Sequence, residues 1–90
     1  MGTGAVTVVT PEAGSEIPAN AEITITFDNP VRDVMVNGVL ATGSAKVWKF
    51  QGDLTGQSGI SITWTNEDAD ATAGGPYHVT YTVKAADDDG

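Results

Sequence analysis

The chain has 90 residues, 40% of them hydrophobic, and a net charge of −8 from 12 acidic and 4 basic side chains. This length fits one domain with one core, and four scattered cations exclude the positive surface that nucleic acids or anionic membranes require. Because the chain has no cysteine, disulfides, thiolate catalysis and cysteine-based zinc sites are excluded as well.

The first half of the chain alternates short β-rich runs with turn residues. The central run, 21–27 (AEITITF), places Ile23, Ile25 and Phe27 on one face of a strand and its threonines on the other. Asn37-Gly38 predicts a two-residue type I′ hairpin turn, because both of its central positions need a positive φ. We therefore expect strands at 5–10, 21–27, 31–36 and 39–41.

The second half of the chain also alternates short β-rich runs with turn residues. Strands are expected at 46–50, 60–65 and 77–84, and a chain break is expected at 42–44. Trp48 and Trp64 alternate with apolar neighbours, which favours core packing over an exposed, sugar-stacking position. In the last strand Tyr77 is expected to face inward and His78 outward. The segment 66–76, with two glycines and a proline, is expected to be a long acidic loop.

Together these runs predict an all-β protein, an antiparallel Ig-like β-sandwich of about seven strands, with no amphipathic helix. The domain is expected to span 5–85, preceded by a lead-in or added segment at 1–4 and followed by an acidic tail or linker at 86–90. No apolar run approaches the ~20 residues of a spanning helix, so we expect no membrane insertion. The expected core side chains are Ile23, Ile25, Phe27, Val34, Val36, Trp48, Phe50, Ile60, Ile62, Trp64, Val79, Tyr81 and Val83.

Motifs in the first half of the chain resemble those of bacterial Ig-like (Big-type) domains. These are the loop Pro11-x-x-Gly14-x-x-Ile17-Pro18, the strand 23–31 (ITITFDNPV) and the hairpin 34–38 (VMVNG). The resemblance implies a monomeric, non-catalytic module of a larger bacterial protein, extracellular or on the cell surface, with the periplasm also allowed. It implies a role as structural spacer or adhesion unit, with neighbouring domains of the same polypeptide and protein or carbohydrate surfaces as partners.

The same opening also resembles periplasmic copper-resistance proteins, which carry a similar P-x-x-G … F-x-x-P-V motif on an Ig-like sandwich. That resemblance implies a copper site built from histidines, one of them near the mature N-terminus, and often from methionines. This chain has one histidine, His78, and two methionines, with no histidine near its start. So few imidazoles disfavour a copper site.

The loop residues Glu67, Asp68 and Asp70 form the candidate metal site, and calcium is the only cofactor that the sequence suggests. Calcium takes six to eight oxygen ligands, which carboxylates on a loop can supply. The EF-hand pattern that starts at Asp68 fails at Ala73 and at Val79, so only a looser calcium site is expected, alone or with Asp87–Asp89. The alternative is a solvated acidic loop.

No catalytic constellation is found, and we expect the protein not to be an enzyme. His78 has no serine or cysteine nucleophile motif beside it. Glu12, Glu16 and Asp28 fall near one end of the expected sandwich, but a glycosidase pair would need a cleft that a sandwich of this size seldom provides. The functional alternative to a spacer is a ligand-binding module, for calcium in the acidic loop or for carbohydrate on exposed aromatics.

Overall fold

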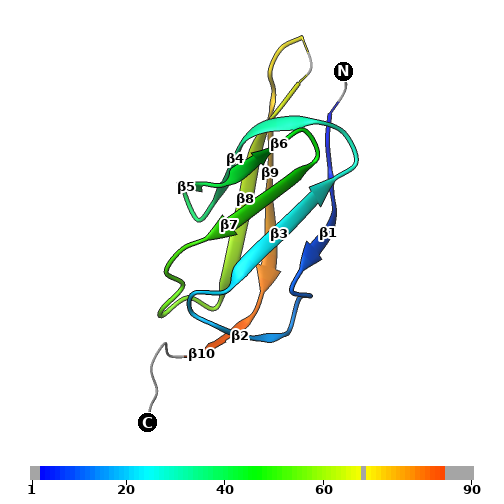
Figure 1. Ribbon diagram of the computed structural model, residues 1–90. Helices are drawn as coiled ribbons and strands as arrows, with labels where there is room; N and C mark the ends of the chain where they lie inside the picture. Colours follow the sequence, from blue (N-terminus) through cyan, green and yellow to red (C-terminus); the bar gives the residue numbers. More distant parts are fainter. Residues whose placement is uncertain (1–2, 68, 85–90) are drawn as a thin grey trace.

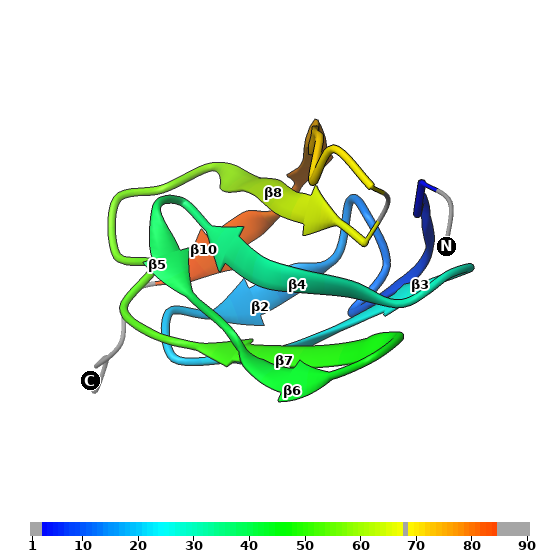
Figure 2. The ribbon, with the colours of Figure 1, turned by 90° about the horizontal axis from the view of Figure 1, so that it is seen from above.

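The structure is a computed structural model that describes residues 3–67 and 69–84, and its strands form two facing layers (Figures 1 and 2). The first sheet has the order β1-β3-β7-β6, made of β1 (Val6–Thr10), β3 (Glu22–Phe27), β7 (Val47–Gln51) and β6 (Thr42–Ser44). The second has the order β5-β4-β8-β9, made of β5 (Val39–Leu40), β4 (Val31–Val36), β8 (Gly59–Asn66) and β9 (Ala73–Thr80). All neighbours within these two sheets are antiparallel.

A third, two-stranded pairing joins the front and the back of the chain. Strand β2 (Glu16–Pro18) runs parallel to β10 (Thr82–Lys84), with Ile17 opposite Val83. Strand β10 follows β9 after a one-residue break at Tyr81. The chain therefore leaves the first sheet after β1, in a loop that starts at Pro11, and crosses to the end of the second sheet (Figure 1).

The β4–β5 hairpin is turned as the sequence predicts. Asn37 has a φ of 52° and Gly38 a φ of 82°, the two positive values that a type I′ turn requires. Beyond the hairpin the chain passes to the first sheet as β6, where a break was expected. That expectation was wrong because Gly43 faces Trp48 in the ladder, and a side chain at Gly43 would collide with the backbone of β7.

The core lies between the sheets and follows the strand alternation. On β3 the apolar positions are buried and the polar ones are partly or fully exposed. Every predicted core residue is buried except Val83, which is half-buried, and both tryptophans are only 8% exposed. The rings of Phe27 and Trp64 meet edge to face, with centroids 5.0 Å apart. The core also includes residues outside the predicted set: Ile17, Val31, Ala41 and Leu54.

Strand β9 begins at Ala73, so the last four residues of the predicted loop 66–76 are strand, as is its first residue, Asn66. Gly74 lies opposite Trp64, and a Cβ at this glycine would fall 2.0 Å from the indole Nε1. The glycine is required for the strand to pass the indole, and it is not a loop signal. Tyr77 pairs with the buried Ile62 but is 39% exposed, because β9 is the last strand of its sheet.

The predicted all-β, antiparallel β-sandwich is confirmed. Each of the seven predicted strands is present. The described residues contain three further segments, because β2 and β6 form within predicted loops and the last strand is split into β9 and β10. Among these residues no helix is long and apolar enough to cross a membrane.

Candidate functional site: a polar hollow beside His78

The acidic loop does not assemble a metal site from the residues that the structure describes. Glu67 and Asp70 are exposed, while Asp68 and the tail 86–90 lie outside the described residues. In 3–67 and 69–84, no three acidic, histidine or cysteine side chains gather closely enough to hold a metal ion. Calcium binding by this loop stays a prediction.

The loop is instead closed by Asn66, the one buried polar residue among those described, which the sequence analysis missed. Its backbone N–H donates to the Thr72 carbonyl at 2.8 Å, and its Nδ2 donates to the Thr72 hydroxyl at 3.2 Å. Its Oδ1 accepts from the Trp64 indole at 3.0 Å and from the Gly4 N–H at 2.9 Å. Asn66 therefore fastens the start of the chain, the core and the loop together, and its role is structural.

Neither tryptophan provides an exposed ring on which a sugar could stack. Both indoles lie in the core, and their N–H groups donate within the protein, from Trp48 to the Ala45 carbonyl and from Trp64 to Asn66. The prediction of core packing is confirmed. Carbohydrate binding through exposed tryptophan is excluded by this burial.

One hollow lies between the β2–β3 turn and the loop that follows β7. It has a volume of about 420 Å³ and is lined by Ala19, Asn20, Gln51, Gly52, Asp53 and Thr55. Gln51 donates to the Asn20 carbonyl at 2.8 Å. The hydroxyl and the N–H of Thr55 hydrogen-bond to Asp53 and lower the pKa of its carboxyl. Among its polar side chains, Gln51, Asp53 and Thr55 are engaged in these hydrogen bonds, and its lining contains no imidazole.

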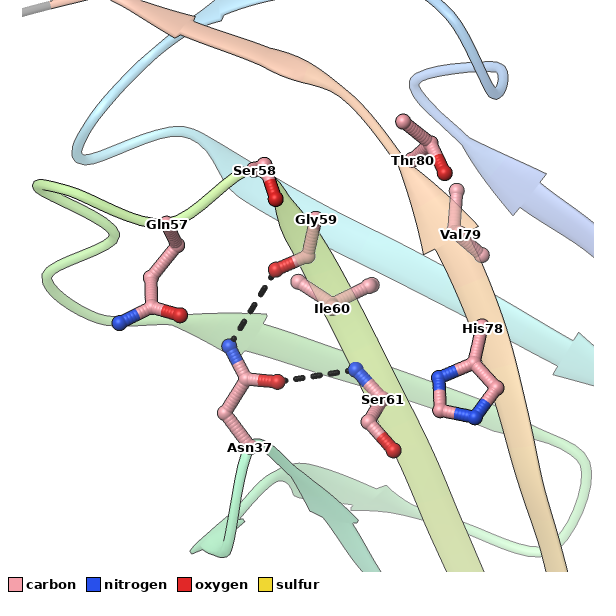
Figure 3. Close-up of a pocket in the computed structure, with 9 residues that line it drawn as sticks. All are labelled: Asn37, Gln57, Ser58, Gly59, Ile60, Ser61, His78, Val79 and Thr80. Atoms are coloured by element: carbon pink, nitrogen blue, oxygen red, sulfur yellow. Dashed lines mark hydrogen bonds between the residues drawn. The ribbon is translucent and has the colours of Figure 1, made fainter.

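A second hollow, of about 250 Å³, lies on the outer face of the second sheet, next to His78 (Figure 3). The register of β8 and β9 places Ser61 directly opposite His78, and Figure 3 shows the imidazole beside this serine. His78 is exposed, as the sequence predicts. The hollow is lined by Asn37, Gln57, Ser58, Gly59, Ile60, Ser61, His78, Val79 and Thr80, none of them acidic or a lysine or arginine.

The hairpin turn fixes one wall of this hollow. The Asn37 N–H donates to the Ser61 carbonyl, and the Ser61 N–H donates back to Asn37 Oδ1, both at 2.9 Å. Asn37 Nδ2 points to the Gly59 carbonyl at 3.5 Å (Figure 3). The side chain of Asn37 thus extends the β4–β8 ladder into the turn, and its Oδ1 is engaged by the Ser61 N–H. The residues left to contact a ligand are His78 and the neutral polar side chains around it.

These features define a β-sandwich with a polar surface hollow and one exposed imidazole. The CopC domain family matches residues 6–90, and because this is nearly the whole chain, the chain belongs to that family. CopC domains are copper-binding proteins of copper resistance, periplasmic or extracellular. No curated protein and no solved structure matches the chain significantly.

Family membership corrects two predictions made from the sequence. The chain is not a bacterial Ig-like (Big-type) domain, and its role as a structural spacer or adhesion unit is overturned in favour of metal binding. The physical reason is that the quoted motifs consist of turn residues and alternating core residues. Such residues specify a sandwich, and they do not distinguish one sandwich family from another. The expected location outside the cytoplasm agrees with the family.

The described residues include few side chains of the kinds that could surround a copper ion as ligands. Imidazole suits copper, and thioethers select Cu(I). Of these donors the described residues offer His78, exposed on β9, and Met35, half-buried on β4. Strand β8 pairs with both β4 and β9, so it lies between Met35 and His78. Within the described ranges the chain therefore supplies one imidazole to a metal, and does not surround it.

Proposed function

We propose that this domain binds copper as cargo outside the cytoplasm, and that its contact with the metal is the imidazole of His78. The observation that carries the proposal is the exposed His78 ring at a surface hollow, in a chain that belongs to a copper-binding family. The role is binding, without catalysis. The finer location that we propose is the periplasm.

A single imidazole implies weak and rapidly exchanging binding. Each further protein ligand would add affinity, and among the described residues His78 belongs to no group of three or more histidine, cysteine or acidic side chains that could hold a metal ion. The net charge of −8 attracts cations to the surface in general and raises their local concentration. Such a domain suits transient copper transfer better than copper storage.

The test is a Cu(II) titration followed by electron paramagnetic resonance and by broadening of the His78 ring signals in NMR. We expect one copper per chain with coupling to one imidazole nitrogen, and we expect His78→Gln to abolish that coupling. Lys49→Gln is the matched control, since Lys49 is exposed on β7 in the other sheet. If His78→Gln binds copper as the unmodified chain does, the proposal is wrong.

A further inference from the structure

The Asn37-Gly38 turn brings a reactive pair of groups to the protein surface. Of the four asparagines in the chain, Asn37 alone is followed by glycine. A backbone nitrogen attacks the side-chain amide of the preceding asparagine most readily when it belongs to a glycine, because no Cβ stands in the way. Both residues are exposed, and no described atom beyond the chain neighbours lies within 4 Å of the place that a Cβ at Gly38 would take. Water therefore has access to the turn.

The other three asparagines are less suited to this reaction. Asn29 precedes a proline, which has no N–H. Asn20 precedes an alanine, whose N–H donates to the Pro18 carbonyl at 3.1 Å. Asn66 is only 4% exposed. Asn37 is therefore the asparagine at which an attack by the following backbone nitrogen meets the least obstruction.

In the folded chain, strand β8 holds the Asn37 amide away from this reaction. Its Oδ1 accepts the Ser61 N–H at 2.9 Å, and its Nδ2 points to the Gly59 carbonyl at 3.5 Å (Figure 3). The attacking nitrogen belongs to Gly38 in the turn, so the amide must leave Ser61 before Cγ can swing towards that nitrogen. The reaction therefore requires the hairpin to open locally, which costs less free energy than unfolding of the whole domain.

We propose that Asn37 is a site of spontaneous deamidation, and that opening of the β4–β5 hairpin controls its rate. The Gly38 nitrogen forms a bond to Cγ of Asn37, the Cγ–Nδ2 bond breaks, and Nδ2 leaves as ammonia with the proton from the Gly38 N–H. Water then opens the resulting succinimide at one of its two carbonyls, which gives aspartate or isoaspartate at position 37. Water is the only co-reactant, and nothing is oxidised or reduced.

Either product would weaken the turn and change the hollow beside His78. A carboxylate at position 37 has no N–H for the Gly59 carbonyl and is repelled by that oxygen. Isoaspartate also adds one methylene to the main chain, which a two-residue type I′ turn cannot accept without a shift between its strands. The hollow, which has no acidic residue in its lining, would gain a negative charge.

The experiment incubates the protein at mildly alkaline pH, folded in buffer and unfolded in guanidinium chloride, and follows each asparagine by peptide mass spectrometry. We expect Asn37 to react ahead of the other asparagines in both states. Its rate should be about tenfold lower in the folded chain, the effect of one or two hydrogen bonds that must first break. Equal rates in the two states, or an earlier reaction at another asparagine of the unfolded chain, would overturn the proposal.

Two matched variants separate opening of the hairpin from unfolding of the whole domain. Leu40→Gly weakens β5 at a side chain that is 62% exposed, and Val8→Gly makes the same kind of change on β1, where the side chain is 52% exposed. Because β5 pairs with β4 across the turn, Leu40→Gly should speed deamidation of Asn37 several-fold, while Val8→Gly should leave its rate unchanged. No acceleration by Leu40→Gly, or equal acceleration by both variants, would show that hairpin opening does not control the reaction.

Discussion

The hydroxyl of Tyr81 donates a hydrogen bond to the carbonyl oxygen of Pro11, 70 residues earlier in the chain. Tyr81 lies at the break between β9 and β10, and Pro11 lies just after β1. Close by, the Gly14 N–H donates to the Thr80 carbonyl at 2.7 Å. These contacts fix the place where the chain crosses from the first sheet to the second.

Tyr81→Phe removes this hydrogen bond and leaves the ring in the core. Because the Pro11 carbonyl then loses its partner in a partly buried place, we expect a loss of about 1–2 kcal/mol of unfolding free energy. That loss corresponds to a fall in Tm of roughly 4–8 °C per kcal/mol, measurable by calorimetry. Tyr77→Phe is the control, since Tyr77 is 39% exposed, and it should change Tm by less than about 3 °C. Equal effects would show that the Pro11 contact is unimportant.

Alkaline pH should destabilise the fold through the same side chain. Burial raises the pKa of Tyr81 above its usual 10.0, because the charged form is poorly solvated there. A raised pKa means that the folded state holds the proton more tightly. The stabilisation is thus complete below pH about 10 and is lost as pH rises towards the folded-state pKa. Urea midpoints between pH about 8 and about 11 should fall less steeply for Tyr81→Phe; parallel curves would contradict this prediction.

Asn66→Ala tests the amide that joins Gly4, Trp64 and Thr72. The substitution leaves the buried indole N–H of Trp64 without its acceptor, which costs about 2 kcal/mol, or roughly 8–16 °C in Tm. Asn29→Ala is the matched control, because Asn29 makes one exposed hydrogen bond, to the Thr3 carbonyl, and its loss should cost less than about 0.5 kcal/mol. A Tm unchanged by Asn66→Ala would show that water replaces this amide.

Gly74→Ala tests the passage of β9 over the indole. Because the new Cβ would fall 2.0 Å from Trp64 Nε1, the ring or the strand must shift, at a cost of about 1–3 kcal/mol. Gly56→Ala is the comparison, since Gly56 has a φ of 81° and open space around it, so that its substitution introduces backbone strain alone. Both variants should unfold at lower urea, but only Gly74→Ala should change the near-ultraviolet circular dichroism of tryptophan. An unchanged spectrum for Gly74→Ala would argue against the close approach of Gly74 to the Trp64 indole.

Much of the fold could be predicted because its signals are local. Alternation over a few residues places Ile23, Ile25 and Phe27 in the core, and two adjacent residues specify the Asn37-Gly38 turn. Leu54 shows where local signals end. It is 1% exposed within a polar loop, because its backbone N–H bonds to the Ala19 carbonyl and draws the loop over the core. The alternation of apolar and polar residues in the sequence does not reveal a contact between two segments this far apart in the chain.

The candidate site was harder to predict for the same reason. Ser61 and His78 come from two strands and Asn37 from the β4–β5 turn, and only the registers of the β4–β8 and β8–β9 pairs bring them to one surface. The sequence correctly predicted that His78 lies on an outer face, but it did not predict which residues surround it. The motifs in 10–38 also suggested the copper-resistance family, but that resemblance was set aside because the chain has one histidine. The motifs could not decide between the two families, because turns and core packing are features that different sandwiches share.

The parallel pairing of β2 and β10 determines how the domain would respond to mechanical force. Strand β1 starts at the upper end of the sandwich and β10 ends at the lower end (Figure 1). Tension applied through the two ends of the chain would pull β2 and β10 in opposite directions along their common axis. The hydrogen bonds between them would be loaded together, in shear, and could not open one after another. This short pairing would therefore act as a clamp that must rupture as a unit before the first and last strands can separate.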